Sequence, residues 1–314
     1  MFSSHNMKTS TLVVGIAVGY ILHIVVHLIE HKISTSEKGC AFADVGPKLE
    51  NHLLLSESRK CPKFVCPLDF ETKKKQAAEK FMSKNIEHDD PGLIQLIQDY
   101  FMEQPPKTKL RNSHGIGKTT HAGKVLEILK NKTGGFFVES GAFDGETTSN
   151  TIYLEQMMNW TGLLIEMDPG LYLQTKGKSR KSVISNACLS PTTHPMKVEI
   201  EDQAWATATR ISVGSKKLQN HNPNAYCFPF YSFMLAMGQT EIDYFSLDIE
   251  GVEYDVLKTI PFDKLNIKVL TVEYAHAKVG KQAFVKLMAE NGYKVHTDLT
   301  KCREFCRDFI FVKE

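Results

Sequence analysis

Four acidic residues follow apolar runs that have the character of buried strands: Glu139, Glu166, Asp248 and Glu273. A carboxylate at the end of a buried strand loses solvation unless it meets a partner, so such groups indicate a functional site. In a parallel sheet these strand ends converge on one edge. Carboxylates gathered there suit a ligand that carries positive charge and hydroxyl groups.

The stretch around Glu139 also contains a glycine turn. Residues 136–139 have strand character, and a Gly-x-x-x-Gly turn runs from Gly141 to Gly145. A strand that leads into a glycine turn brings the backbone close to a nucleotide-like ligand. Glu166 follows Gly145 by 21 residues, near the spacing of about 20 residues for an acid that binds ribose hydroxyls. Together these features predict a cofactor with an adenosyl group.

These residues resemble the first motif of S-adenosylmethionine-dependent methyltransferases of the FkbM type. Glu139, Gly141, Ala142 and Gly145 match that motif, whereas Phe143 stands where the family usually has Asn. A second block, Ser-Leu-Asp-Ile-Glu-Gly-Val-Glu at 246–253, is similar to the family's Asp-x-Glu-Gly-x-Glu motif.

The resemblance covers roughly residues 115–314. It implies an α/β fold with a Rossmann-like, seven-stranded, mostly parallel sheet of the class I methyltransferase type, and S-adenosylmethionine as cofactor. Asn186 and Ala187 resemble the segment that approaches adenine, so both join the cofactor-binding candidates.

The candidates for catalysis are Asp248 and Glu250, followed by His276. Methyl transfer depends mainly on positioning, and a hydroxyl acceptor also benefits from a base near the methyl group. Structural alternatives stay open. Asp248 can cap the next helix, His276 can be an ordinary loop residue, and Glu166 can be a surface acid. Glu139 and the glycines can form a turn kept by a fold that no longer binds cofactor.

The elements that must position these residues alternate along the chain, which implies a mostly parallel sheet with helices on both faces. Strands are expected at 136–139, 163–166, 183–185, 196–201, 242–248 and 267–273, with an antiparallel pair at 293–297 and 309–312. Helices are expected at 73–86, from 91 to about 101, and at 122–130, 146–158, 169–176, 252–259 and 281–291. Residues 205–233 are expected to be irregular.

Residues 12–29 form an 18-residue apolar run without Asp, Glu, Lys or Arg. As a helix this run is ~27 Å long, near the thickness of a bilayer core. We predict a transmembrane signal anchor at 11–29, a cytoplasmic tail at 1–10, a stalk and linker at 30–87, and a methyltransferase-like domain at 88–314 with its core at 134–314. Gly15 and Gly19 permit close helix crossing and therefore a homodimer.

Two sequons, at Asn131 and Asn159, favour a lumenal domain on a single-pass type II protein of the secretory pathway. Seven cysteines are too few for a disulfide scaffold. Local disulfides are expected at Cys61/Cys66 and Cys302/Cys306 in preference to a zinc site, and no metal site is predicted. Cys40 is a candidate for a bond between chains, and Cys188 is expected to be a buried thiol.

Several functions are excluded by the sequence. Basic and acidic residues number 38 and 36, so no global field favours nucleic acid. The loop at Gly117 fails as a phosphate loop because Asn112 stands where glycine is required. The glycine turn also lacks the Gly-x-Gly-x-x-Gly of an NAD-dependent dehydrogenase.

Two functions remain open. One is a membrane-anchored O-methyltransferase. The other follows from a closer resemblance, carried by the motifs above together with Leu-Lys-Thr-Ile-Pro at 257–261, to a membrane-anchored member of the family. That resemblance implies a trafficking factor that assists the export of growth-factor precursors from the endoplasmic reticulum to the Golgi and endosomes. In such a protein the methyltransferase fold would serve as a non-catalytic scaffold.

Overall fold

A computed structural model describes residues 67–82, 85–105, 117–178, 180–201, 210–212, 224–300 and 307–314. The chain divides into two compact units, Met1–Pro62 and Lys63–Glu314. The first unit lies outside the described residues, as do the predicted membrane segment with Gly15 and Gly19, and Cys40, Cys61, Cys66, Cys302 and Cys306. Within the described ranges, no helix has the length and apolar character that crossing a membrane requires.

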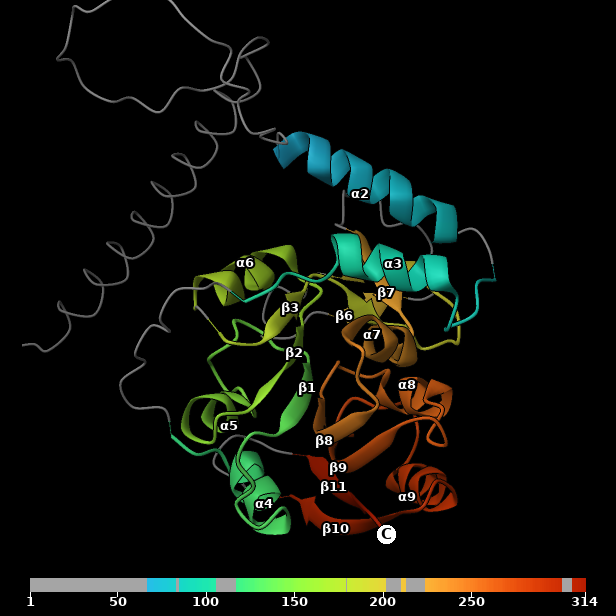
Figure 1. The fold of residues 1–314 in the computed structure, drawn as a ribbon. Coiled ribbons are helices and arrows are strands. Elements are labelled where there is room, and N and C mark those ends of the chain that lie inside the picture. The colour runs from blue at the N-terminus through green and yellow to red at the C-terminus, as the bar shows by residue number, and fades with distance from the viewer. Residues whose placement is uncertain are drawn as a thin grey trace, which may run out of the picture. The chain divides into compact units, whose positions relative to one another are not determined.

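A seven-stranded sheet forms the centre of the domain, in the order β10-β11-β9-β8-β1-β2-β3 (Figure 1). Its strands are β1 (Phe136–Ser140), β2 (Thr161–Ile165), β3 (Val183–Ser185), β8 (Glu241–Leu247), β9 (Asn266–Glu273), β10 (Tyr293–Leu299) and β11 (Asp308–Lys313). The strands from β9 to β3 pair in parallel, whereas β11 runs antiparallel to both β9 and β10. The expected mostly parallel seven-stranded sheet is confirmed.

Both faces of the sheet are apolar. Successive side chains of each buried strand point to opposite faces and pack into different hydrophobic cores. Val138 packs with the helices α3 (Pro91–Tyr100), α7 (Phe230–Met237), α8 (Glu253–Thr259) and α9 (Lys281–Glu290). Phe137 packs on the other face with α4 (Thr120–Ile128) and α5 (Ile152–Met157). Figure 1 shows the sheet between these two groups of helices, with α6 (Pro169–Gly177) on the side of α4 and α5.

The turn before α5 replaces a helix that the sequence favoured. A helix was expected at 146–158, but α5 begins only at Ile152. The Asp144 carboxylate accepts hydrogen bonds from the backbone N–H groups of Glu146 (2.9 Å) and Thr147 (2.7 Å). Thr148 then adopts a positive φ of 57°. These local bonds compete with helical ones and hold the segment in turns.

A second, four-stranded sheet lies after β3, in the order β4-β7-β5-β6. Its strands are β4 (Cys188–Leu189), β5 (Met196–Glu201), β6 (Arg210–Ser212) and β7 (Asn224–Phe228). The expectation of irregular structure over 205–233 was therefore wrong for β6, for β7 and for the start of α7. The prediction of a buried Cys188 thiol was also wrong, because Cys188 forms a disulfide with Cys227, its partner in the parallel pair β4–β7.

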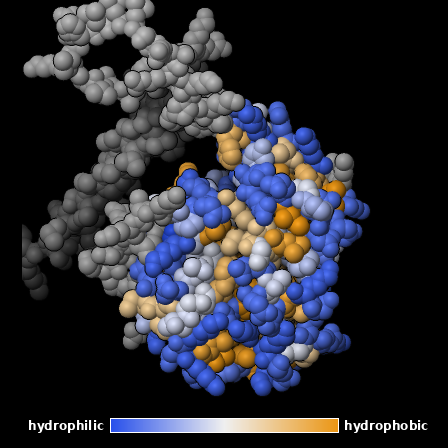
Figure 2. Space-filling model, in the orientation of Figure 1, coloured by the Kyte–Doolittle hydropathy of each residue, from blue (hydrophilic) through white to orange (hydrophobic). Residues whose placement is uncertain are grey.

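Helix α2 (Pro67–Met82) lies within the segment predicted as stalk and linker. It belongs to the compact unit, because Ala78 is fully buried in the core next to α3 and Glu79 pairs with Lys197 of β5 (2.7 Å). Figure 2 shows one face of the molecule, on which apolar side chains form separate patches among hydrophilic ones.

Candidate active site

A cavity of about 200 Å³ opens where β1, β2 and β8 end. Two of the four strand-end acids of the sequence prediction, Glu166 and Asp248, line it. The described residues that line it are Ser140, Gly141, Phe143, Thr147, Thr148, Ile165, Glu166, Met167, Leu171, Ala187, Cys188, Leu189, Asp248, Ile249, Glu250 and Val252.

Gly141 is required at the floor of this cavity. Its φ is +82°, and a Cβ atom on it would lie 1.8 Å from the carbonyl oxygen of Asp248. Its N–H donates to the Ile165 carbonyl at 3.1 Å, which ties the turn to the end of β2. Only a residue without a side chain allows the ends of β1 and β8 to approach this closely.

Phe143 occupies the position where the FkbM motif usually has Asn. Its φ is +53°, a left-handed conformation that Asn adopts far more readily than Phe. The tertiary fold holds it there, because its N–H donates to Glu166 Oε2 at 2.8 Å. The departure from the motif therefore preserves the backbone of the turn and changes the side chain that faces the cavity.

Glu166 is buried, with 7% of its surface exposed, and it lines the cavity. Its two oxygens accept hydrogen bonds from the N–H groups of Phe143 and Asp168 (2.9 Å). Burial raises the pKa of the Glu166 carboxyl to about 7, although these two N–H donors oppose the shift. Each carboxylate oxygen has a second lone pair, so the group retains the capacity to accept bonds from ribose hydroxyls.

The loop after β8 carries the Asp-x-Glu-Gly-x-Glu motif and is organised by its last acid. The carboxylate of Glu253 accepts bonds from the N–H groups of Ile249 (2.9 Å) and Gly251 (3.0 Å). These bonds stabilise positive φ angles at Glu250 (63°) and Gly251 (117°). The N-cap of α8 is Val252 without a side-chain cap bond, so the alternative that Asp248 caps this helix is wrong.

Asp248 and Glu250 project from this loop and line the cavity. Burial raises the pKa of Asp248 well above its usual range, and the carboxyls of Asp308, Glu250 and Glu253 add to the shift. This end of the cavity therefore gathers several carboxyl groups, and a sulfonium or ammonium group placed there would favour their ionised form.

His276 lies outside the cavity wall, on the loop after β9, and its ring contacts Glu250 and Glu273. Its Nδ1 atom is 2.7 Å from Glu250 Oε2 and 3.1 Å from Glu273 Oε1. An ordinary loop histidine would not be expected to contact two carboxylates, Glu250 and Glu273, at once. Burial raises the pKa of Glu273 to about 9, with a further contribution from the neighbouring carboxyls.

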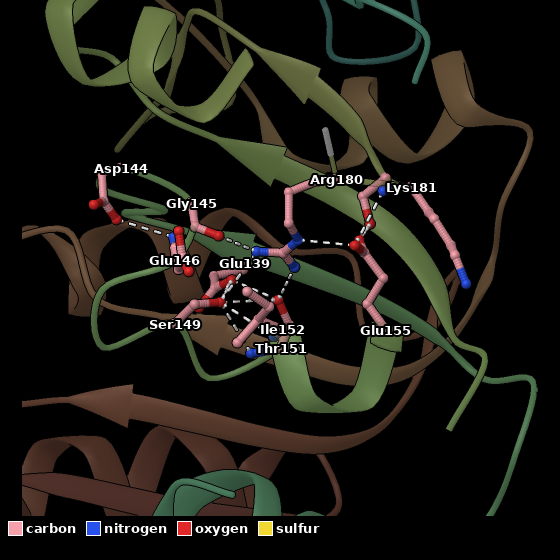
Figure 3. A network of polar contacts seen from close by, with 11 residues as sticks. Glu139, Asp144, Gly145, Glu146, Ser149, Thr151, Ile152, Glu155, Arg180 and Lys181 are labelled. Carbon is pink, nitrogen blue, oxygen red and sulfur yellow. Dashed lines mark hydrogen bonds and ion pairs between the residues drawn. The ribbon is translucent and has the colours of Figure 1, made fainter. Parts of the chain in front are cut away.

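Glu139 does not line the cavity. Residues alternate along β1, so its side chain lies on the same face as Phe137, towards the turn before α5. There it accepts hydrogen bonds from Ser149 Oγ (2.8 Å), the Asn150 N–H (2.7 Å) and Thr151 Oγ1 (Figure 3). Glu139 therefore positions the turn that carries Thr147 and Thr148, both of which line the cavity.

Of the other predicted cofactor-binding residues, one lines the cavity and the others pack behind the residues that line it. Ala187 lines the cavity, whereas Asn186 donates from Nδ2 to the carbonyls of Glu166 (3.0 Å) and Met167 (3.1 Å). Asn186 also lines a second groove, of about 850 Å³. Ala142 is buried behind the wall, and Gly145, at φ +76°, packs against Thr175.

A buried ion pair that sequence reasoning missed supports the same turn. Arg180 Nε donates to Glu155 Oε1 at 3.0 Å, and 1% or less of either side chain is exposed. The guanidinium also donates to the Gly145 carbonyl and to Thr151 Oγ1 (3.0 Å) (Figure 3). Glu155 further accepts from the Lys181 N–H at 3.0 Å. No local pattern around Arg180 signals this role.

Sequence reasoning also missed the apolar wall formed by Met167, Leu171 and Ile249. Met167 and Ile249 directly follow the strand-end acids Glu166 and Asp248, and that position was the available signal. An apolar wall beside a hydroxyl-binding acid fits an adenosyl group, and the carboxylates of the loop after β8 fit its cationic end. The residues present therefore fit S-adenosylmethionine.

The strand order and the site at the carboxyl ends of the strands define a class I, S-adenosylmethionine-dependent methyltransferase fold. The sequence model of the Methyltransferase FkbM domain matches residues 139–295, half of the chain. The chain therefore belongs to the FkbM methyltransferase family, and the expected resemblance to that family is confirmed.

Solved structures with similarity to the chain are distant. Methyltransferase FkbM from Methylobacillus flagellatus is 13% identical, with a TM-score of 0.34, over 77% of this chain and 58% of that one. A TehB-like SAM-dependent methyltransferase from Corynebacterium glutamicum is 12% identical, with a TM-score of 0.34, over 62% and 88%. LepI, solved as a complex with SAM, is 11% identical, with a TM-score of 0.31, over 72% and 53%. Scores this low add no argument about activity. Comparison with curated proteins gave no match.

Proposed function

We propose that the chain is a membrane-anchored O-methyltransferase that transfers the methyl group of S-adenosylmethionine to a hydroxyl-type acceptor. The observation that carries the proposal is the cavity at the carboxyl edge of the sheet, where Gly141, Glu166 and Asp248 meet. When bound, the cofactor would supply the methyl group of its sulfonium centre. As the acceptor oxygen bonds to the methyl carbon, the carbon–sulfur bond breaks and S-adenosylhomocysteine, a thioether, is the leaving group.

Within this proposal, Glu166 holds the ribose hydroxyls and Asp248 takes the proton of the acceptor hydroxyl. The raised pKa of Asp248 makes it, once it is ionised, a stronger base than a carboxylate with an ordinary pKa. A positive charge in the cavity favours its ionised form. Positioning of acceptor and methyl group supplies most of the rate.

Radiolabelled methyl transfer tests this activity. Full-length protein in detergent is incubated with methyl-labelled cofactor and extracts of secretory-pathway glycans and proteins. We expect label that resists mild base, as an ether does, and a loss of at least about 100-fold in Asp248→Asn, the scale of general-base catalysis. Equal incorporation by wild type and Asp248→Asn would rule out this role for Asp248.

The affinity for S-adenosylmethionine is expected to rise with pH up to about neutrality. Because burial raises the pKa of Glu166 to about 7, the carboxyl is protonated below that value and loses the acceptor that a ribose hydroxyl needs. Affinity should fall by up to about tenfold for each pH unit below about 7. Titration calorimetry across this range checks the prediction, and Glu166→Gln should bind more weakly with no such slope. A wild-type affinity that is flat in pH would contradict it.

We further propose that the domain lies in the lumen of the secretory pathway, on a type II membrane protein. Asn131 and Asn159 are exposed on turns that precede β1 and β2, at the sheet edge opposite the cavity. The Cys188–Cys227 disulfide supports an oxidising compartment. Glycosidase treatment of the full-length protein should shift its mobility, and Asn131→Gln and Asn159→Gln should each remove part of the shift. An unchanged mobility with both sequons intact would argue against a lumenal domain.

A scaffold function is the second candidate, and Phe143 is the observation that favours it. Phe143 faces the cavity where the family usually has Asn. The chain's motifs also resemble those of the membrane-anchored protein Star, which implies export of growth-factor precursors from the endoplasmic reticulum to the Golgi and endosomes. Co-precipitation of a membrane-bound growth-factor precursor, together with no cofactor binding at millimolar concentration, would favour this function over methyl transfer.

A further inference from the structure

A second group of ligand atoms lies beside the cavity, behind Glu250. One oxygen each from Glu250 and Glu273 and a ring nitrogen of His276 lie within 4.8 Å of one another. Glu250 and His276 lie on the loops that follow the neighbouring parallel strands β8 and β9, and Glu273 is the last residue of β9. Glu250 also lines the cavity, so the group opens towards the place where an acceptor would sit.

The distances within this group suit a small divalent cation. The Nδ1 atom of His276 is 2.7 Å from the Glu250 oxygen and 3.1 Å from the Glu273 oxygen. Ligands that bind one cation at about 2.1 Å in octahedral geometry are separated by about 3 Å along each edge. Two carboxylates and one imidazole are a donor set that suits Mn²⁺ and similar metals.

Glu273 supplies an independent indication of a ligand. The residue is buried, with 8% of its total surface and 11% of its side chain exposed, and its Oε2 atom has no hydrogen-bond partner. Among the described residues, no lysine or arginine pairs with Glu273, whereas oxygens of Asp248 and Glu253 lie within 4.8 Å. A buried carboxylate oxygen that faces further carboxylates is costly unless a cation joins them.

We propose that Glu250, Glu273 and His276 bind a divalent cation of the Mn²⁺ class beside the methyl-transfer cavity. This revises the expectation of no metal site. Its role rests on the proposed function: a hydroxyl that coordinates such a cation has a lowered pKa, so Asp248 can take its proton more easily. His276, with 40% of its side chain exposed, leaves the cation accessible from solvent.

Binding of Mn²⁺ alone tests the proposal, without cofactor or acceptor. Mn²⁺ is titrated into the metal-stripped full-length protein in detergent, and the spectroscopic signal of the free aqueous ion is followed. We expect one ion per chain, with affinity lowered by more than about tenfold in Glu273→Gln and in His276→Ala. The exposed Asp255 of α8 provides a matched control, and Asp255→Asn should bind as wild type does.

A loss of fold is separated from a loss of ligand by thermal unfolding. Because Glu273→Gln replaces a buried carboxyl that is crowded by other carboxyls with a neutral amide of similar shape, its metal-free Tm should equal or exceed that of the wild type, while Mn²⁺ should no longer raise it. Wild-type protein that leaves millimolar Mn²⁺ free, or variants that bind as wild type does, would overturn the proposal. Those results would leave the cofactor titration unaffected, so failure of the metal site and failure of the methyltransferase proposal are distinguishable.

Discussion

Replacing Arg180 with methionine is expected to lower the free energy of unfolding by about 3–5 kcal/mol, because a buried ion pair that loses one partner leaves an uncompensated charge. Here that charge is Glu155, whose side chain is fully buried. The variant also loses the donors to the Gly145 carbonyl and Thr151. The turn that carries Thr147 and Thr148 into the cavity should loosen, so cofactor affinity should fall together with stability.

Urea unfolding of the full-length protein in detergent, followed by the fluorescence of the fully buried Trp160, measures the stability change. Lys181→Met is the matched control, because the side chain of Lys181 is exposed, and it should change stability by no more than about 0.5 kcal/mol. The double variant Glu155→Met/Arg180→Met should recover part of the loss, since an apolar pair often replaces a buried ion pair at little cost. A wild-type stability for Arg180→Met would show that the pair does not support the fold.

Substitution of Gly141 by alanine should have a comparable effect through the backbone. The new Cβ would lie 1.8 Å from the Asp248 carbonyl oxygen, and the φ of +82° is unfavourable for any residue with a side chain. The overlap is between backbone segments at the ends of β1 and β8, so neither can rotate away. We expect a loss of about 2–5 kcal/mol and no cofactor binding.

Gly238 separates the steric overlap of the new Cβ from the strain of a positive φ. It also has a positive φ, +64°, but a Cβ there would meet nothing within 4 Å. Gly238→Ala should therefore cost only about 1 kcal/mol and leave cofactor binding unchanged. Equal losses of stability in the two variants would show that the approach of β1 to β8 is unimportant.

Four of the five parallel strands, β1, β2, β8 and β9, were predictable because each is mainly apolar and has an acid at its carboxyl end. β3 was expected at the residues where it lies, 183–185, and β9 ends at Glu273 as expected. The segment 146–151 was not predictable as turns, because its composition suits a helix and the deciding bonds come from the side chain of Asp144.

Long-range pairings explain the remaining differences. Cys188 and Cys227 are 39 residues apart, and only the pairing of β4 with β7 brings them together. Glu139 matches a cofactor motif, yet strand alternation directs its side chain to the turn before α5, while the next residue, Ser140, lies on the opposite face and lines the cavity. Strand-end position therefore predicted the edge of the sheet on which the site lies, but not which acids face the ligand.

Calorimetric titration of S-adenosylmethionine into the full-length protein in detergent tests the central claim most directly. We predict one cofactor per chain, strong weakening in Glu166→Ala, and unchanged binding in Glu241→Ala, an exposed acid at the start of β8 on the opposite edge of the sheet. The absence of binding at millimolar cofactor, or equal binding by Glu166→Ala and the wild type, would contradict a cofactor site at this cavity.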